Sequence, residues 1–244
     1  MARRPARKAS RRPPRPPRAG ASVEPPTPTT DREKIIAAFL ALLADEPFES
    51  IGLADVAGQA GVSLAQLRDE FPSTLAILAA HMKATDRTVL AADYSDMAEE
   101  PERERLFDVL MRRLEILAPH RDAVRSLIRS ARRDPPLALA LNRLAVRSQQ
   151  WMLTAAGIGA SGPRGMVRAQ GLAMLFASVL RTWVNDDDPG HARTMAALDR
   201  ALGRGQRMLG LMEDVCAIPA RLCRLRPRRR RRRDEDYEEE AAPA

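Results

Sequence analysis

The fold of this chain is predicted by residues 53–71, which read LADVAGQAGVSLAQLRDEF. Apolar residues recur there at three- and four-residue spacing on both sides of Gly61, and this spacing predicts two short helices over 53–60 and 64–70. Gly61 supplies the backbone freedom that a tight turn needs, and the hydroxyl of Ser63 is expected to cap the second helix. The stretch therefore has the pattern of a helix-turn-helix.

Two apolar residues are expected to hold this pair of helices together, namely Val62 in the turn and Leu67 in the second helix. With both pointing inward, the opposite side of the second helix faces outward and is free to enter the major groove of a DNA duplex. Because a three-residue turn with glycine also occurs in other helical proteins, the interpretation depends on the surrounding sequence as well.

Helical periodicity continues on both sides of the motif, and no strand-like alternation of apolar and polar residues appears. Upstream, Asp31 is expected to cap a helix with a wide apolar face. Downstream, prolines and a glycine-rich loop at 157–165 separate longer helices, and the acidic turn at 185–190 precedes the last one. The predicted helices cover residues 32–44, 53–60, 64–70, 74–92, 101–118, 120–133, 135–156, 166–184 and 192–215. The sequence thus predicts an all-α fold.

The basic charge of the chain is confined to its two ends. The net charge is +8, but residues 1–30 carry eight Arg or Lys and one acid, and residues 221–244 carry nine Arg and six acids. The ends therefore contribute +7 and +3, and −2 is left for residues 31–220. Arg and Pro interleave at 12–18, a pattern that forms neither a helix nor a core, so we expect disordered tails. Such a basic arm either contacts phosphates or only keeps the chain soluble.

Four regions follow from these patterns. They are a disordered basic arm at 1–30, a helix-turn-helix module at 31–80, a helical core at 81–216 and a disordered basic-then-acidic tail at 217–244. The longest apolar run, Gly171 to Leu180, is too short to span a bilayer, and the Arg/Pro-rich start does not resemble a signal peptide. Cys216 and Cys223 make no disulfide framework. We therefore expect a cytoplasmic protein.

The wider stretch of about residues 31–80 resembles the TetR family of bacterial regulators. The resemblance is carried by Lys34-Ile35-Ile36-Ala37-Ala38-Phe39, Phe48-Glu49-Ser50-Ile51, Leu53-Ala54-Asp55-Val56-Ala57, Ala60-Gly61-Val62-Ser63 and Phe71-Pro72-Ser73. It implies a TetR-like fold and a homodimer whose paired third helices read a palindromic operator in double-stranded DNA. It also implies a pocket in the C-terminal core, where a small apolar ligand controls DNA binding.

The chain departs from the family's pattern at three positions. The family commonly has a Lys after the turn Ser, a Tyr before the closing aromatic segment and a Lys after Pro-Ser, where this chain has Leu64, Arg68 and Thr74. The module is also acidic, with three bases against eight acids in residues 31–80, so it offers few charges to phosphates. DNA binding would then depend on the basic arm. The alternative is that the module is only an inherited scaffold.

The candidate DNA contacts are polar or outward positions of the motif together with arginines of the arm. They are Ser63, Leu64, Gln66, Arg68, Thr74, Arg11, Arg12, Arg15 and Arg18. Ser63, Gln66 and Arg68 would provide contacts to the duplex, and a change at Gln66 is expected to alter sequence preference, whereas the arm would provide the attraction to phosphates.

The last two long predicted helices are candidates for a dimer interface, because in TetR-like proteins these helices of each chain form a four-helix interface. The candidate interface residues are Val179, Trp183, Met195, Leu198, Leu202 and Leu209. The candidate ligand-pocket residues are Met111, Leu114, Met152, Met174 and Phe176. Methionine adapts to apolar ligands of varied shape. For both sets the alternative is an ordinary apolar core within one chain.

Part of the core, about residues 105–202, also resembles the lipid-binding accessory proteins of coenzyme Q biosynthesis. The similar segments are LAPHRDAVR at 117–125, WVNDDD at 183–188 and TMAALDR at 194–200. This resemblance implies an isoprenoid lipid bound in the helical core without specific DNA binding, and an amphipathic helix near 215–226 that contacts membranes. Pro219 and Pro227 weaken such a helix, and a frayed basic tail is the alternative.

No pattern of catalytic or metal-binding residues is recognisable. His81, His120 and His191 lack partners at metal-ligand spacing, and the acidic run 186–188 is expected to cap a helix rather than bind a cation. We therefore expect no enzyme activity, no cofactor and no metal. Two functions remain, which are a TetR-type transcriptional regulator controlled by a small apolar ligand and a lipid-binding accessory protein of quinone biosynthesis with the same fold.

Overall fold

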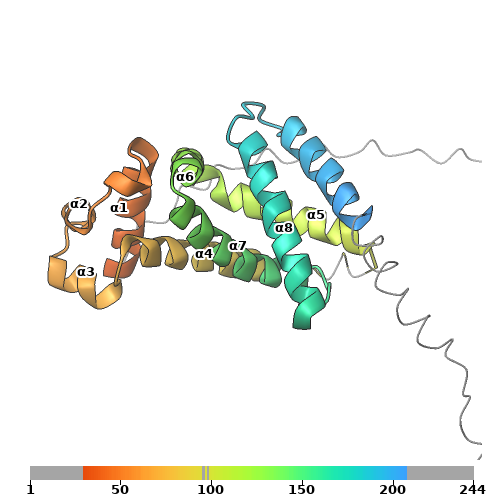
Figure 1. The fold of residues 1–244 in the computed structure, drawn as a ribbon, viewed down its shortest axis with the longest axis horizontal. Coiled ribbons are helices and arrows are strands. Elements are labelled where there is room, and N and C mark those ends of the chain that lie inside the picture. Colours follow the sequence, from red (N-terminus) through yellow and green to blue (C-terminus); the bar gives the residue numbers. More distant parts are fainter. Residues whose placement is uncertain (1–29, 95–96, 98, 208–244) are drawn as a thin grey trace, which may run out of the picture.

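The computed structural model describes residues 30–94, 97 and 99–207, and all regular structure within them is helical (Figure 1). The helices are α1 (Asp31–Asp45), α2 (Leu53–Ala60), α3 (Leu64–Glu70), α4 (Thr74–Leu90), α5 (Glu102–Leu117), α6 (Arg121–Arg133), α7 (Pro135–Ala155) and α8 (Gly162–Trp183), with 3-10 turns at Phe48–Ser50 and Ala118–His120. A last helix covers residues 192–207. The prediction of an all-α fold is confirmed. In this described part, no helix has the length and hydropathy needed to cross a membrane.

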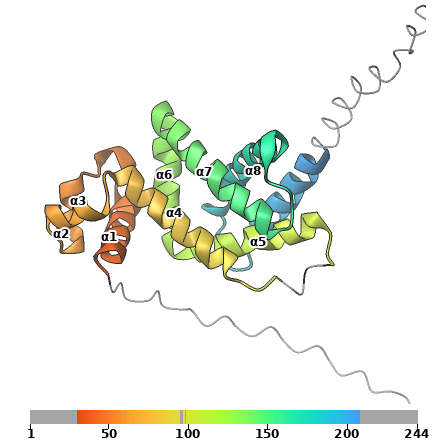
Figure 2. The same cartoon turned by 90° about the horizontal axis from the view of Figure 1, so that it is seen from below.

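The N-terminal module consists of α1, α2 and α3, which lie together at one end of the molecule (Figure 1, Figure 2). Ile35, Phe39 and Leu43 follow one another at four-residue spacing and so share one face of α1, where all three are buried. Leu67 of α3 and Phe71 after it are buried in the same apolar cluster. The three short helices thus enclose one core, which fixes their mutual orientation.

Helix α4 joins this module to the rest of the chain. Ile77 and Leu78 in its first half are buried in the core of the module, whereas Val89 near its end is buried in the second core. The helix therefore runs without a break through residue 80, where the sequence analysis sets a domain boundary. One helix therefore contributes buried residues to both cores.

Helix α6 makes a second connection to the module. Its Ser126 Oγ donates a hydrogen bond of 2.8 Å to the carbonyl oxygen of Glu46, and the Phe48 N–H donates one of 3.0 Å to Ser130 Oγ. Ala123, one turn before Ser126, is buried in the apolar cluster of the module. Because small residues occupy this face of α6, α1 packs closely against it.

The larger core lies between α4, α5, α7, α8 and the last helix (Figure 1). Buried residues at its centre come from four of these helices and are Leu110, Leu114, Met152, Phe176, Trp183 and Leu198. Helices α7 and α8 pack along each other, and the side-chain amides of Asn142 and Gln170 exchange two hydrogen bonds of 3.0 Å between them. The long helices of the chain thus share one apolar core, separate from the core of the N-terminal module.

Four of the six predicted dimer residues lie inside the chain. Val179 and Trp183 of α8, and Leu198 and Leu202 of the last helix, are buried in the chain's own core. Their spacing marks the face of each helix that packs against its own chain, so these four are not available to a partner, which corrects the prediction. Met195 is 38% exposed. Leu209 lies outside the described residues.

Two helices begin earlier than the sequence analysis predicts. Thr30 rather than Asp31 caps α1, because its Oγ1 accepts the Glu33 N–H at 3.2 Å while the Glu33 carboxylate accepts the Thr30 N–H at 3.1 Å. Helix α8 begins at Gly162, inside the predicted loop, with Pro163 in its first turn. A proline there is favourable, because its missing N–H would have no partner in any case.

The acidic turn before the last helix is a capping turn, as the sequence predicts. Asp186 Oδ2 accepts hydrogen bonds from the backbone N–H of Thr194 at 2.9 Å and from its hydroxyl at 2.6 Å. Asp188 accepts the N–H groups of Gly190 and Ala192. Asp186 is buried, and the hydrogen bonds from Thr194 lower its pKa. Both carboxylates are therefore occupied in starting a helix.

Candidate nucleic-acid interface and a groove in the core

The turn between α2 and α3 has the geometry that the sequence predicts. Gly61 ends α2 with φ of 67°, a left-handed conformation that residues with a Cβ rarely adopt. Ser63 then caps α3, because its Oγ accepts the Gln66 N–H at 3.2 Å. Val62 is half-buried and Leu67 is buried between the helices. The helix-turn-helix is thereby confirmed as a structure.

The outer face of α3 is exposed to solvent. Leu64 at its start is 58% exposed, and Ser63 and Arg68 are exposed on either side of the buried Leu67. Thr74, the first residue of α4, is half-buried. Figure 1 places α2 and α3 at the end of the molecule opposite α5 and α8. A large partner such as a duplex therefore has access to this face.

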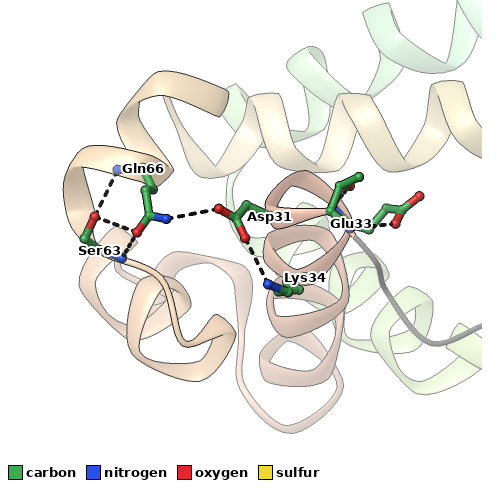
Figure 3. A network of polar contacts seen from close by, with 6 residues as sticks. Asp31, Glu33, Lys34, Ser63 and Gln66 are labelled. Atoms are coloured by element: carbon green, nitrogen blue, oxygen red, sulfur yellow. Dashed lines mark hydrogen bonds and ion pairs between the residues drawn. The ribbon is translucent and has the colours of Figure 1, made fainter.

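Gln66 is engaged within the protein (Figure 3). Its Oε1 accepts the Ser63 N–H at 2.9 Å and the Ser63 hydroxyl at 2.8 Å, and its Nε2 donates to Asp31 Oδ2 at 3.0 Å. Asp31 in turn pairs with Lys34 at 3.0 Å. A contact between Gln66 and a base would require these bonds to break, so this side chain first serves to fix α3 against α1.

The basic arm joins the module beside α3. Thr30, the first described residue, caps α1, and Asp31 next to it is bonded to Gln66 of α3. The predicted contacts of the arm, Arg11, Arg12, Arg15 and Arg18, lie outside the described residues.

The module carries a net negative charge, and two of its three basic residues form ion pairs with acidic residues of the module. Arg32 pairs with Glu70 at 3.0 Å and lies over the ring of Phe71, 4.5 Å from its centroid. Lys34 pairs with Asp31. Within the described residues, Arg68 is the base of this module that makes no ion pair. The module therefore offers little attraction to phosphates, and the arm would have to supply it.

A groove of about 630 Å³ opens in the larger core. Helices α5 and α8, which line it, lie at the end of the molecule away from the module (Figure 1). The walls of the groove come from α5, α8, the end of α7 and the last helix, and its apolar lining includes Leu106, Leu153, Leu172, Leu175 and Leu202. The space exists because small residues line the facing helices, among them Gly171 of α8 and Gly205 of the last helix. Three arginines and one glutamate also line it: Arg103, Arg168, Arg204 and Glu102.

None of the five predicted pocket residues lines this groove. Leu114, Met152 and Phe176 are buried in the closed part of the core, and Met111 is half-buried against it. Met174 is 66% exposed on the outside of α8. The structure therefore does not bring the five together around this cavity. All five are apolar residues on helices, and residue type alone does not indicate whether such a side chain faces the groove, the closed core or solvent.

The groove was not predictable from the sequence, because its lining is mainly leucines and arginines of the kind found throughout the chain. The one available signal was the pair of glycines, Gly171 and Gly205, inside two predicted helices. Glycine weakens a helix, so its presence there usually has a packing reason or leaves space. Finding the groove also required knowing that these two helices are neighbours.

The comparisons with known proteins concern structure alone. No family model matches the chain, and no curated protein matches its sequence. Solved structures do match, including a TetR transcriptional regulator from Nitrosomonas europaea with a TM-score of 0.55 and 20% identity, over 72% of this chain and 97% of that one. The chain has a TetR-like fold.

Two further regulators have the same fold. One, from Rhodococcus sp. RHA1, has a TM-score of 0.52 and 22% identity, over 72% of this chain and 95% of that one. A TetR-family regulator from Syntrophomonas wolfei has a TM-score of 0.52 and 14% identity, over 73% and 94%. All three are described as transcriptional regulators. At these identities the likeness establishes the TetR-like fold, which the resemblance of residues 31–80 predicts.

Proposed function

We propose that this protein is a ligand-responsive, DNA-binding regulator of transcription. The observation that carries the proposal is the helix-turn-helix, in which Leu67 is buried while Leu64 and Arg68 point outward from α3. The solved proteins with the TetR-like fold are named as transcriptional regulators, which supports the same role. DNA is the partner that an exposed second helix of this motif fits.

In this proposal α3 enters the major groove and the arm neutralises phosphates. Arg68 would read a base edge or contact a phosphate, and Leu64 would contact a thymine methyl group. Ser63 and Thr74 carry hydroxyls suited to phosphate contacts. The eight basic residues of the arm offset the acidic module, so most of the electrostatic attraction would come from residues 1–29.

We further propose that two copies bind as a homodimer. Five large apolar side chains are exposed on the neighbouring helices α7 and α8, and they support a dimer surface there. These are Leu139 and Trp151, each 54% exposed, with Met166 at 53%, Val167 at 50% and Met174 at 66%. A two-fold pair would present two α3 helices to half-sites about one helical turn of DNA apart.

Selection from a pool of random duplexes tests the proposal. The full chain is expected to enrich a palindrome and to bind it less tightly as salt rises. Removal of residues 1–29, which leaves the Thr30 cap in place, should weaken binding to all sequences alike and flatten the salt dependence. Arg68→Ala should change sequence preference, whereas Arg181→Ala on α8 should not. If no palindrome is enriched, the protein is not a specific DNA-binding regulator.

The alternative, a lipid-binding accessory protein of quinone biosynthesis, is favoured by one observation. The module holds three bases against eight acids, and two of the bases already have acidic partners. Under this hypothesis an isoprenoid lipid copurifies with the chain, and deletion of the gene lowers quinone levels. Mass spectra without lipid after native extraction, together with unchanged quinone levels, would reject it.

A further inference from the structure

We propose that the groove between α5, α8 and the last helix binds a single-chain amphiphile with a carboxylate head, such as a fatty-acid anion. Its volume of about 630 Å³ falls in the range of about 300–1,000 Å³ that is typical of small-ligand sites. This ligand class would be that of the regulator proposed above, and an effect of the ligand on DNA binding rests on that proposed function. Binding of the ligand to the groove does not depend on it.

The floor of the groove suits an aliphatic chain. Leu106, Leu172 and Leu202 line it from three different helices, and each is largely buried. A Cβ placed on Gly171 would meet no atom within 4 Å, which shows that the space beside this part of α8 is open. An aliphatic chain lying on these leucines would be removed from water without leaving a polar group unpaired.

The groove is lined by three arginines against one acid, Glu102, so its charged residues favour an anionic head group over a neutral one. Of the three arginines there, Arg103 pairs with Asp199 and Glu104, and Arg168 donates to the carbonyl oxygen of Gly159 at 3.4 Å. Arg204 is exposed and makes no ion pair within the described residues. Its guanidinium offers two parallel N–H donors, the geometry that a carboxylate accepts.

Calorimetric titration of the full chain with decanoate and with decanol tests the head group, because the two probes share a chain and differ in charge. Decanoate should bind one molecule per chain, about tenfold more tightly than decanol. Arg204→Glu should weaken decanoate binding about tenfold and leave decanol unchanged. Arg193→Glu is the matched control, since Arg193 is exposed on the same helix but does not line the groove.

A second pair of variants tests the place of binding. Gly171→Leu fills the groove without meeting other atoms at its Cβ, and it should abolish binding of both probes. Gly203→Leu is its control, because a Cβ there also meets nothing within 4 Å and Gly203 does not line the groove. Both changes replace a helical glycine by a better helix former, so thermal unfolding should show that each variant stays folded.

Three outcomes would overturn the inference. The first is that the full chain binds neither probe, and the second is that decanol binds as tightly as decanoate. The third is that Gly171→Leu turns a dimer into a monomer in sedimentation while decanoate binding persists, which would make the groove an interface between copies. Decanoate binding without an enriched palindrome would uphold this inference and reject the regulator, and the reverse result would uphold the regulator alone.

Discussion

Gln66 of α3 donates a hydrogen bond of 3.0 Å from its Nε2 to Oδ2 of Asp31, in the first turn of α1 (Figure 3). The oxygen of the same amide accepts both hydrogen bonds from Ser63 that close the cap of α3. The Gln66 side chain thus caps the start of α3, the helix proposed to contact DNA. It also links α3 to α1, the helix that follows the basic arm.

Gln66→Ala is expected to lower the free energy of unfolding by about 1 kcal/mol, because it removes half of a capping box and the bond to Asp31. Urea denaturation followed by circular dichroism measures this loss. Gln59→Ala is the control, since Gln59 is exposed on the adjacent α2, and it should change stability by less than about 0.5 kcal/mol. Equal losses in the two variants would show that the network does not hold α3.

A buried ion pair connects α4 to α5. Arg113, 3% exposed, pairs with Asp86, which also accepts the Ser148 hydroxyl at 2.7 Å. Arg113→Met should cost about 3–5 kcal/mol, because the Asp86 carboxylate is left buried without its counter-charge. The double change Asp86→Leu with Arg113→Met should recover much of that loss.

The adjacent Arg112 provides the control for this ion pair. Its pair with Glu115 is 3.9 Å long and both side chains are more than half exposed. Arg112→Met should therefore cost less than about 1 kcal/mol. Chemical denaturation of the three variants measures the difference, and similar losses from Arg112→Met and Arg113→Met would contradict the assigned role of burial.

The stability of the protein is expected to fall below about pH 6.5 because of His81. Its ring contacts that of His120 edge to face, with centroids 5.1 Å apart. Burial, followed by the nearby His120 and Arg113, lowers the pKa of His81 from 6.5 to about 4. Between these values the unfolded chain binds more protons, so the contribution of His81 is full above pH 6.5 and is lost as pH falls towards 4.

Comparison of wild type with His81→Gln isolates this effect. The drop in unfolding free energy between pH 7 and pH 4 should be smaller in His81→Gln, by up to about 3 kcal/mol. NMR titration of the His81 ring measures its pKa directly. A His81 resonance that titrates near 6.5 in the folded protein would contradict this expectation.

The cap at Asp186 is expected to stabilise the start of the last helix. Asp186→Ala removes two hydrogen bonds from Thr194 and should cost about 1–2 kcal/mol. Its neighbour Asp187 is exposed, so Asp187→Ala should change stability by less than about 0.5 kcal/mol. Thermal unfolding of the two variants measures the difference. Equal losses of stability in Asp186→Ala and Asp187→Ala would indicate a general effect of removing negative charge and would contradict the role of the cap.

Features that depend on a few adjacent residues were predictable from the sequence. The φ of 67° at Gly61, the cap at Ser63 and the burial of Leu67 all follow from turn chemistry and helical spacing within ten residues. The capping turn at Asp186 is predictable for the same reason, since its partner Thr194 is eight residues away. Local hydrogen bonds and helical periodicity leave few other conformations open to such segments.

Roles that depend on which face of a helix meets a neighbour were not predictable. Helix α8 is apolar nearly all round, so its sequence did not distinguish the buried Trp183 from the exposed Met174. The bond from Gln66 to Asp31 joins residues thirty-five positions apart and has no local signature. The sequence therefore determined the helices, the turn and the TetR-like fold, through periodicity and capping. Only the tertiary structure decided which apolar faces close the core and which leave a groove, because packing between distant helices selects among faces of similar hydrophobicity.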